Sequence, residues 1–149
     1  MTRNTAREIA THLAYELSFT ELPVEEFLRQ RLSEEHFQAL AQEYDIYGEL
    51  PNQKQHDYIC RLVSGVAEHG AELDEYIRRY AVGWRFERIS LMASAIMRVA
   101  MYEVLYMPDV PDSAAINEAV EIAKKYETPE TVKFLNGILG SFSRAEVKD

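Results

Sequence analysis

Apolar residues recur at helical spacing along most of the chain. In the first segment they fall at intervals of three and four and form one stripe, made of Ala6, Ile9, Ala10, Leu13, Ala14 and Leu17. The basic and polar residues Arg3, Arg7 and His12 fall largely off this stripe. No run of alternating β-branched residues and no Asn-Gly or Asp-Gly pair indicates a strand or a hairpin. The pattern therefore predicts an all-α protein.

Prolines and capping residues divide this pattern into about seven helices joined by short loops. Pro23, followed by two glutamates in a first turn, fits a helix start, and residues 47–52 form the clearest loop. Ser33 is typical of a cap between two short helices. Thr128-Pro129-Glu130 combines a capping hydroxyl, a proline at the first position and an acid in the first turn. These signals place the last helix after residue 128.

The segment Phe86–Tyr106 is apolar on nearly every side, which is typical of the central helix of a bundle. Arg98 and Glu103 interrupt it and need partners if they are buried. We therefore expect a compact helical bundle. Its expected organisation is a single domain 1–149, with an N-terminal half of about 1–80, a C-terminal half of about 81–143 and a frayed tail 144–149.

Charge and cysteine content limit the class of protein. The 149 residues carry a net charge of −9, which argues against binding nucleic acid by overall charge. Residues 1–80 account for −7 of this charge and residues 81–149 for −2, so a small basic patch in the second half is still possible. The single cysteine, the absence of a signal peptide and the absence of a membrane span predict a soluble, cytoplasmic protein.

No catalytic or metal-binding pattern stands out from the sequence. His56 and Cys60 are spaced to share a metal, but zinc needs two further ligands and none is suitably spaced. There is no glycine-rich phosphate loop and no nucleophile elbow. We expect no enzyme activity, no catalytic residue, no cofactor and no metal.

Four motifs in the second half of the chain occur in a specific order. They are W-R-F-E-R-I at 84–89, M-R-V-A-M-Y-E at 97–103, I-N-E-A-V-E-I-A-K at 116–124 and K-F-L-N-G-I-L at 133–139. Together they closely resemble the NusB family of bacterial transcription antitermination factors. The resemblance continues through Ala6-Arg7-Glu8 and Tyr15 in the first helix, spans essentially the whole chain and is weakest at about 22–55.

This resemblance implies a transcription antitermination and elongation factor with the NusB-like helical fold. Members bind the boxA segment of nascent RNA together with NusE, a small-subunit ribosomal protein. We therefore expect boxA-like RNA, NusE and the transcription elongation complex as partners, a role in ribosomal RNA transcription, and a monomer or homodimer. Matched by position, the RNA-binding residues are Arg3, Arg7, Tyr15, Tyr126, Glu130, Lys133 and Phe134.

The residue types at these positions suit single-stranded RNA. Exposed aromatic rings stack on unpaired bases, and Lys and Arg hold phosphates. The carboxylate of Glu130 can accept a hydrogen bond from a base amino group. The alternatives are core packing for Tyr126 and Phe134, and a solvated helix start for Arg3 and Arg7.

Other polar residues in the motifs have a structural explanation. Buried polar groups are normally paired, which favours an architectural role for Asn117, Glu118, Arg98, Glu103, Asn136 and Gly137. A glycine inside an apolar helix costs about 1 kcal/mol relative to alanine. We expect a close approach of another helix to account for Gly137.

Two features depart from the family pattern. Asn4 and Thr5 stand between Arg3 and Arg7, where the family has a denser arginine cluster, so RNA affinity should be weaker and less salt-dependent. Ala93 stands where the family usually has an acid that faces NusE. An alternative function is therefore a protein-interaction module with little RNA affinity of its own. A third, the RNA-binding part of an RNA cytosine methyltransferase, lacks a following cofactor-binding segment.

Overall fold

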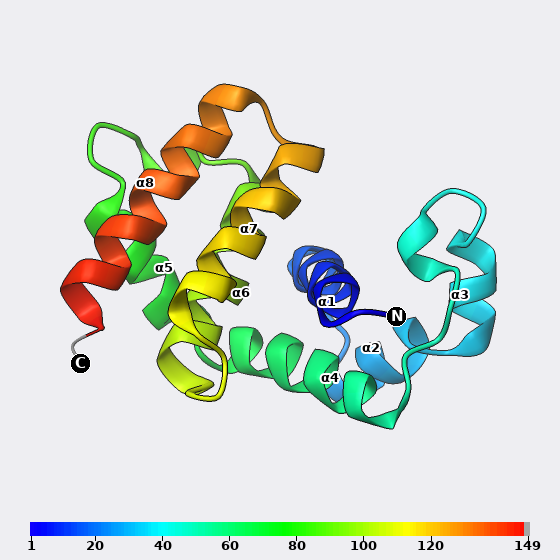
Figure 1. Cartoon of the computed structure of the whole chain (residues 1–149). Helices are drawn as coiled ribbons and strands as arrows, with labels where there is room; N and C mark the ends of the chain where they lie inside the picture. Colours follow the sequence, from blue (N-terminus) through cyan, green and yellow to red (C-terminus); the bar gives the residue numbers. More distant parts are fainter. Residues whose placement is uncertain (148–149) are drawn as a thin grey trace. The chain divides into compact units, whose positions relative to one another are not determined.

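The structure is a computed structural model, and it describes residues 1–147 (Figure 1). Over this range the regular elements are eight α-helices and two short 3-10 helices, with no strand. The α-helices are α1 (Arg3–Leu17), α2 (Val24–Arg31), α3 (Glu34–Leu40), α4 (Gln53–Glu68), α5 (Gly70–Tyr80), α6 (Leu91–Tyr106), α7 (Asp112–Tyr126) and α8 (Pro129–Glu146). The 3-10 helices are η1 (Asp45–Tyr47) and η2 (Phe86–Arg88). The all-α prediction is confirmed, with eight helices where about seven were expected.

Local signals set several helix starts as the sequence predicts. The Ser33 hydroxyl accepts a hydrogen bond from the His36 backbone N–H at 3.1 Å and caps α3. The Thr128 hydroxyl accepts one from the Thr131 N–H at 3.2 Å, and Pro129 is the first residue of α8. Each cap satisfies a backbone donor that the helix itself leaves without a partner.

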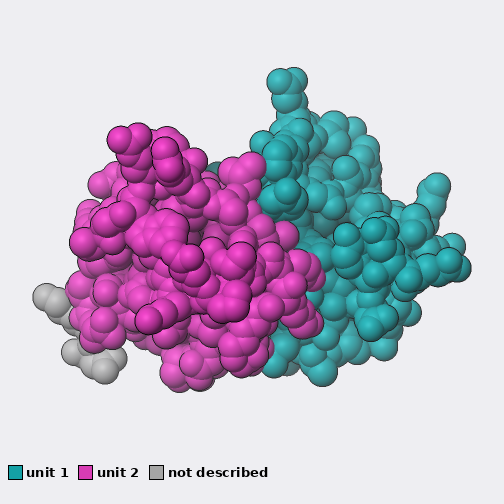
Figure 2. Space-filling view, turned by 90° about the horizontal axis from the view of Figure 1, so that it is seen from above, with its two compact units in different colours: residues 1–68 teal, residues 69–149 magenta. Residues whose placement is uncertain are grey.

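The chain divides into two compact units, residues 1–68 and residues 69–149, which Figure 2 colours separately. The division lies between α4 and α5, earlier than the expected boundary near residue 80. The reason is that α5 packs against α6 and α8. The helix at 70–80 thus belongs with the second half of the chain.

In the first unit α1 lies along α4, and α2 contacts both of them. The rings of Phe27, Phe37 and Tyr47 are buried and form the aromatic part of its core. The Arg31 guanidinium pairs with the Glu16 carboxylate at 2.7 Å and joins α2 to α1. Burial raises the pKa of the Tyr47 hydroxyl above its ordinary value.

In the second unit α6 is the central helix, in contact with α5, α7 and α8. Its side chains are buried on most sides, as the sequence predicts. Arg98 has the partner it needs, because its guanidinium donates to the Asp74 carboxylate at 2.6 Å. Glu103 is fully buried. The Tyr106 hydroxyl donates to Glu72 at 2.6 Å, and this hydrogen bond raises the pKa of Tyr106 to about 12.

The end of the described chain is more ordered than expected. Fraying from Arg144 was predicted, yet α8 continues to Glu146. The Glu146 carboxylate accepts hydrogen bonds from the Tyr80 hydroxyl and from the Arg79 guanidinium, the latter at 3.0 Å. These partners hold the last turn of α8 against the end of α5, and the prediction is wrong for this stretch. The final two residues of the predicted frayed tail, 148–149, lie outside the described range.

None of the helices within residues 1–147 combines the length and the apolar character needed to span a lipid bilayer.

Candidate nucleic-acid interface

The start of α8 presents a charged and aromatic surface. Glu130 and Lys133 are exposed, and Phe134 is half-buried. The Phe134 ring lies against the Trp84 ring, with centroids 4.1 Å apart and planes inclined by 33°. Trp84 is itself 41% exposed, so this contact is at the surface and Phe134 is not a core residue. The alternative that Phe134 packs in the core is therefore wrong.

These side chains border one groove in the second unit, which we call the aromatic groove. Its volume is about 450 Å³. Its lining residues are Tyr80, Val82, Trp84, Glu130, Lys133, Phe134, Gly137, Ile138 and Ser141. Three of the predicted site residues, Glu130, Lys133 and Phe134, are thus brought together. Trp84 and Gly137 join them, although the sequence predicted neither as a site residue.

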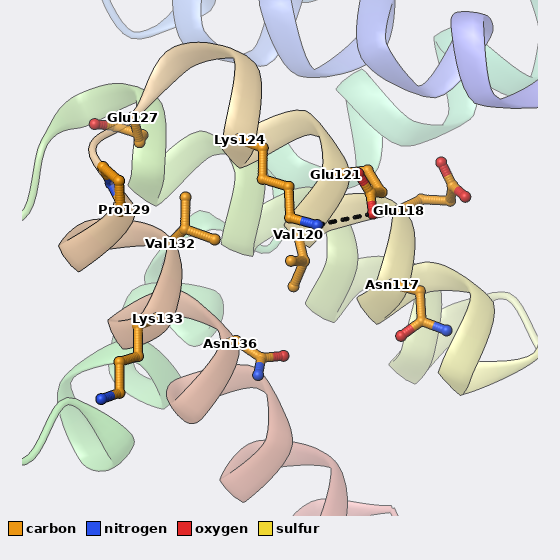
Figure 3. Close-up of a pocket in the computed structure, with 10 residues that line it drawn as sticks. All are labelled: Asn117, Glu118, Val120, Glu121, Lys124, Glu127, Pro129, Val132, Lys133 and Asn136. Atoms are coloured by element: carbon orange, nitrogen blue, oxygen red, sulfur yellow. Dashed lines mark hydrogen bonds and ion pairs between the residues drawn. The ribbon is translucent and has the colours of Figure 1, made fainter.

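A second groove, which shares Lys133 with the first, is lined by residues of α7 and α8 and of the turn between them (Figure 3). We call it the polar groove; its volume is about 640 Å³. Asn117 and Asn136 line it, and Lys124 extends along it to an ion pair with Glu121 at 3.1 Å. Lys133 borders both grooves. The polar groove therefore offers amide groups and charges of both signs.

Several motif residues expected to be architectural are at the surface instead. Asn117 and Asn136 are exposed, and within residues 1–147 neither side chain has a hydrogen-bond partner. Gly137 is exposed, and a Cβ built on it meets nothing within 4 Å. The predicted close approach of another helix at Gly137 is wrong, because this face of α8 borders the aromatic groove. The architectural interpretation fits Arg98 and Glu103, which lie in the interior of the second unit. Glu118 is half-buried and lines the polar groove.

Tyr126 lies at the end of α7 and is half-buried. It does not line the aromatic groove. Tyr126 has an interaction with another residue of the chain. Of the four site residues predicted in the second unit, Tyr126 is the one that stands apart.

The predicted site residues of the first unit all lie on α1. Arg3 is exposed, and its guanidinium stacks over the Tyr58 ring at 4.7 Å. Arg7 is only 3% exposed, and its guanidinium donates to the side-chain amide oxygen Oδ1 of Asn4 at 2.9 Å. A solvated position for Arg7 is therefore wrong. The buried surface of α1 is wider than the apolar stripe, because it includes Arg7 and the neighbouring Glu8.

Tyr15 is half-buried near the end of α1, where it contacts a second aromatic ring. The Phe19 ring meets it edge-on, with centroids 5.0 Å apart, and Phe19 is 61% exposed. Phe19 was not predicted as a site residue. One feature of the sequence could have indicated it: Phe19 is a large apolar residue that follows the end of the apolar stripe of the first helix.

His56 and Cys60 contact each other, with Nδ1 and Sγ 3.7 Å apart. Burial raises the pKa of the Cys60 thiol, which favours a packed thiol over a reactive thiolate. Within residues 1–147 no group of three or more potential ligands gathers around a metal position.

The sequence and the fold both match known proteins. The model of the NusB family matches residues 4–144. The transcription antitermination protein NusB of Carboxydothermus hydrogenoformans is 40% identical over 140 residues, which cover 94% of this chain and 91% of the relative. The chain belongs to the NusB family. The predicted family and its helical fold are confirmed.

Two solved structures support the NusB fold. The NusB of T. maritima superimposes with a TM-score of 0.80 and 27% identity, covering 99% of this chain and 94% of that one. A chain from the crystal structure of the antitermination factors NusB and NusE in complex with dsRNA matches with a TM-score of 0.73 and 20% identity, covering 96% of each. The curated relatives are named transcription antitermination proteins.

The structure shows where the departure from the NusB pattern at position 93 lies. Ala93, which stands where the family usually has an acid, is fully buried near the start of α6. The neighbouring Ser94 is 2% exposed. In this chain the position is filled by a small core residue and presents no charge.

Proposed function

We propose that this protein is a transcription antitermination and elongation factor that binds boxA-type single-stranded RNA together with NusE. The observation that carries the proposal is the gathering of Glu130, Lys133 and Phe134 on one groove at the start of α8. In this role it joins the transcription elongation complex and supports ribosomal RNA transcription. Because its relatives are bacterial transcription factors, we place it in the cytoplasm.

The chemistry of the aromatic groove suits an unpaired base and its phosphate. The Phe134 ring offers a face for stacking, which is tolerant of base identity. The Lys133 ammonium reaches solvent beside it and attracts a phosphate. Glu130 accepts hydrogen bonds from base amino groups, which adds a preference for bases that carry them.

The remaining proposed RNA contacts come from Arg3, Tyr15 and Tyr126. Arg3 is exposed, its guanidinium lies over the Tyr58 ring, and it adds a positive charge to the proposed RNA surface. Arg7 contributes in our proposal by holding the Asn4 side chain at the start of α1. This small number of cations, in a chain of net charge −9, predicts modest affinity for RNA alone.

A basic partner compensates for that modest affinity. The acidic surface attracts a positively charged ribosomal protein and repels free RNA, so binding is favoured when both partners arrive together. One solved structure of this fold contains NusB, NusE and RNA. We therefore propose a ternary complex as the functional state.

The test is titration of fluorescent boxA RNA with the protein, alone and with NusE, across a salt series. We expect weak binding by the protein alone and tighter binding with NusE. No complex with both partners at low salt would overturn the proposal.

A second candidate is a protein-interaction module with little RNA affinity, favoured by the burial of Arg7. It predicts that NusE binds normally and that RNA adds nothing to the stability of that complex. The same titration separates the two functions.

A further inference from the structure

We infer that the aromatic groove holds an unpaired RNA base against Trp84, that Gly137 leaves the space for it, and that Arg85 and Arg88 hold the adjoining phosphates. The inference rests on the proposed RNA-binding function and adds Trp84, Gly137, Arg85 and Arg88 to the residues that determine RNA affinity. It extends the interface from the start of α8 onto the loop between α5 and α6.

Trp84 lies at the surface, where its ring can contact a ligand, and not in the core. It is 41% exposed, and Val82 beside it is 86% exposed. Exposed aromatic side chains next to a groove are typical of a binding surface. The Trp84 and Phe134 rings stack on one another, with centroids 4.1 Å apart and planes inclined by 33°. Each ring covers part of one face of the other, so the base of the proposed complex stacks on the part of Trp84 that stays exposed.

Gly137 has no structural reason to be a glycine. It lies inside α8, where glycine costs about 1 kcal/mol relative to alanine. Its φ is not positive, since Gly83 is the only residue with positive φ in the described chain. A Cβ at position 137 would meet no atom within 4 Å and would point into open space beside the aromatic groove. The missing side chain is best explained by the space it leaves.

The charge beside the groove identifies its occupant as a nucleic acid. Arg85 and Arg88 line an adjoining hollow of about 380 Å³ together with Trp84. Among the residues that the structure describes, no carboxylate forms an ion pair with Arg85, Arg88 or Lys133. The arginines at the end of α5 differ, because Arg78 pairs with Glu75 and Arg79 with Glu146. Cations without intramolecular partners beside an aromatic surface favour phosphate and base over an apolar peptide.

The wild-type chain contains its own reporter for this groove. Trp84 is the only tryptophan in the sequence, so the intrinsic tryptophan fluorescence comes from this one position. We expect boxA RNA to quench it at the same concentrations at which the anisotropy of labelled RNA rises. The titration uses the protein without NusE at low salt, so that no other tryptophan contributes.

Two variants test the contribution to affinity. Trp84→Leu should weaken RNA binding roughly tenfold or more, because stacking on one ring contributes about 1–3 kcal/mol. Gly137→Met should weaken RNA binding to a similar extent while raising the melting temperature, since its side chain fills the groove and removes a helix glycine. Leu91→Ala and Ala145→Met are matched controls at exposed sites outside the groove, and we expect RNA binding as in the wild type.

The outcomes separate this inference from the proposed function. RNA binding with unchanged Trp84 fluorescence and an unaffected Trp84→Leu variant would overturn the inference and leave the proposed function intact. No RNA binding even with NusE would overturn both. A Trp84→Leu variant that binds RNA normally but loses NusE would assign the groove to a protein and would also overturn the inference.

Discussion

The starts of α1 and α8 carry similar candidate residues but place them differently. On α1 the two arginines are engaged within the first unit, Arg3 over the Tyr58 ring and Arg7 buried beside Asn4. On α8 the charged residues Glu130 and Lys133 are exposed on a groove beside a surface aromatic pair. The charged candidate residues of α1 thus already have contacts within their unit, whereas those of α8 are exposed beside a groove.

This difference shows that a basic residue in a family motif is not automatically a phosphate contact. A guanidinium that is already stacked or hydrogen-bonded must give up that contact before it gains another. Lys133 has no such contact to lose within the described chain. The comparison predicts that α8 contributes more RNA affinity than α1.

The largest expected effect is at Phe134. Phe134→Ala should lower boxA affinity roughly tenfold or more, because it removes one stacking ring. The melting temperature should change little, since Phe134 is half-buried and its ring partner Trp84 is exposed. Anisotropy titration and thermal unfolding by circular dichroism measure the two effects. A large drop in melting temperature with normal RNA affinity would show that Phe134 serves stability and not RNA binding.

Arg7→Ala tests the structural side of the comparison. We expect it to lower the free energy of unfolding by about 1–3 kcal/mol, because a buried hydrogen-bonded group is lost. Arg3→Ala is the control on the same helix, and it should lower stability less than Arg7→Ala, because a cation–π contact at an exposed site contributes about 0.5–1 kcal/mol. Denaturant unfolding measures both. If Arg7→Ala instead unfolds like the wild type and loses RNA affinity, Arg7 is a direct RNA contact.

A smaller effect is expected at Lys133. Lys133→Ala should reduce the slope of log affinity against log salt by about 0.7, the contribution of one phosphate contact to single-stranded nucleic acid. Lys124→Ala is the matched control, because Lys124 is already paired with Glu121. Titrations at several salt concentrations give both slopes. If Lys133→Ala and Lys124→Ala gave equal salt slopes, the ion pair of Lys124 with Glu121 would not keep Lys124 from binding a phosphate.

The smallest expected effect is the pH dependence of the first unit. The pKa of His36 is lowered from 6.5, mainly by burial and further by the charge of Arg31. Its Nε2 atom is buried without a hydrogen-bond partner in the described chain. The folded state therefore binds the proton less readily than the unfolded state, and stability falls as pH drops through about 6.5 and below.

His36→Phe should remove this part of the pH dependence while preserving stability near neutral pH. Thermal unfolding from about pH 8 to about pH 5.5 measures it. Identical pH profiles for the variant and the wild type would show that His36 does not contribute.

Local signals in the sequence predicted the helices better than the site. The caps at Ser33 and Thr128 depend on neighbours within three residues, so they can be read from the chain. The burial of Arg7 depends on packing around α1, which periodicity alone does not reveal. Gly137 shows the reverse error, because a helix glycine was taken as a packing residue and lies at the surface. The Trp84–Phe134 pair joins residues far apart in sequence and required the fold.

The loop between α5 and α6 is held at both ends. At its start the Tyr80 hydroxyl donates to Glu146, and at its end the Ser90 hydroxyl donates to Glu127. When binding orders a mobile loop, the loss of conformational entropy lowers the affinity. A loop that is already ordered before binding does not carry this cost. The tethers therefore link the end of α8 and the α7–α8 junction to the strength of RNA binding. Glu146→Ala should weaken boxA binding in an anisotropy titration, although Glu146 is not a proposed RNA contact.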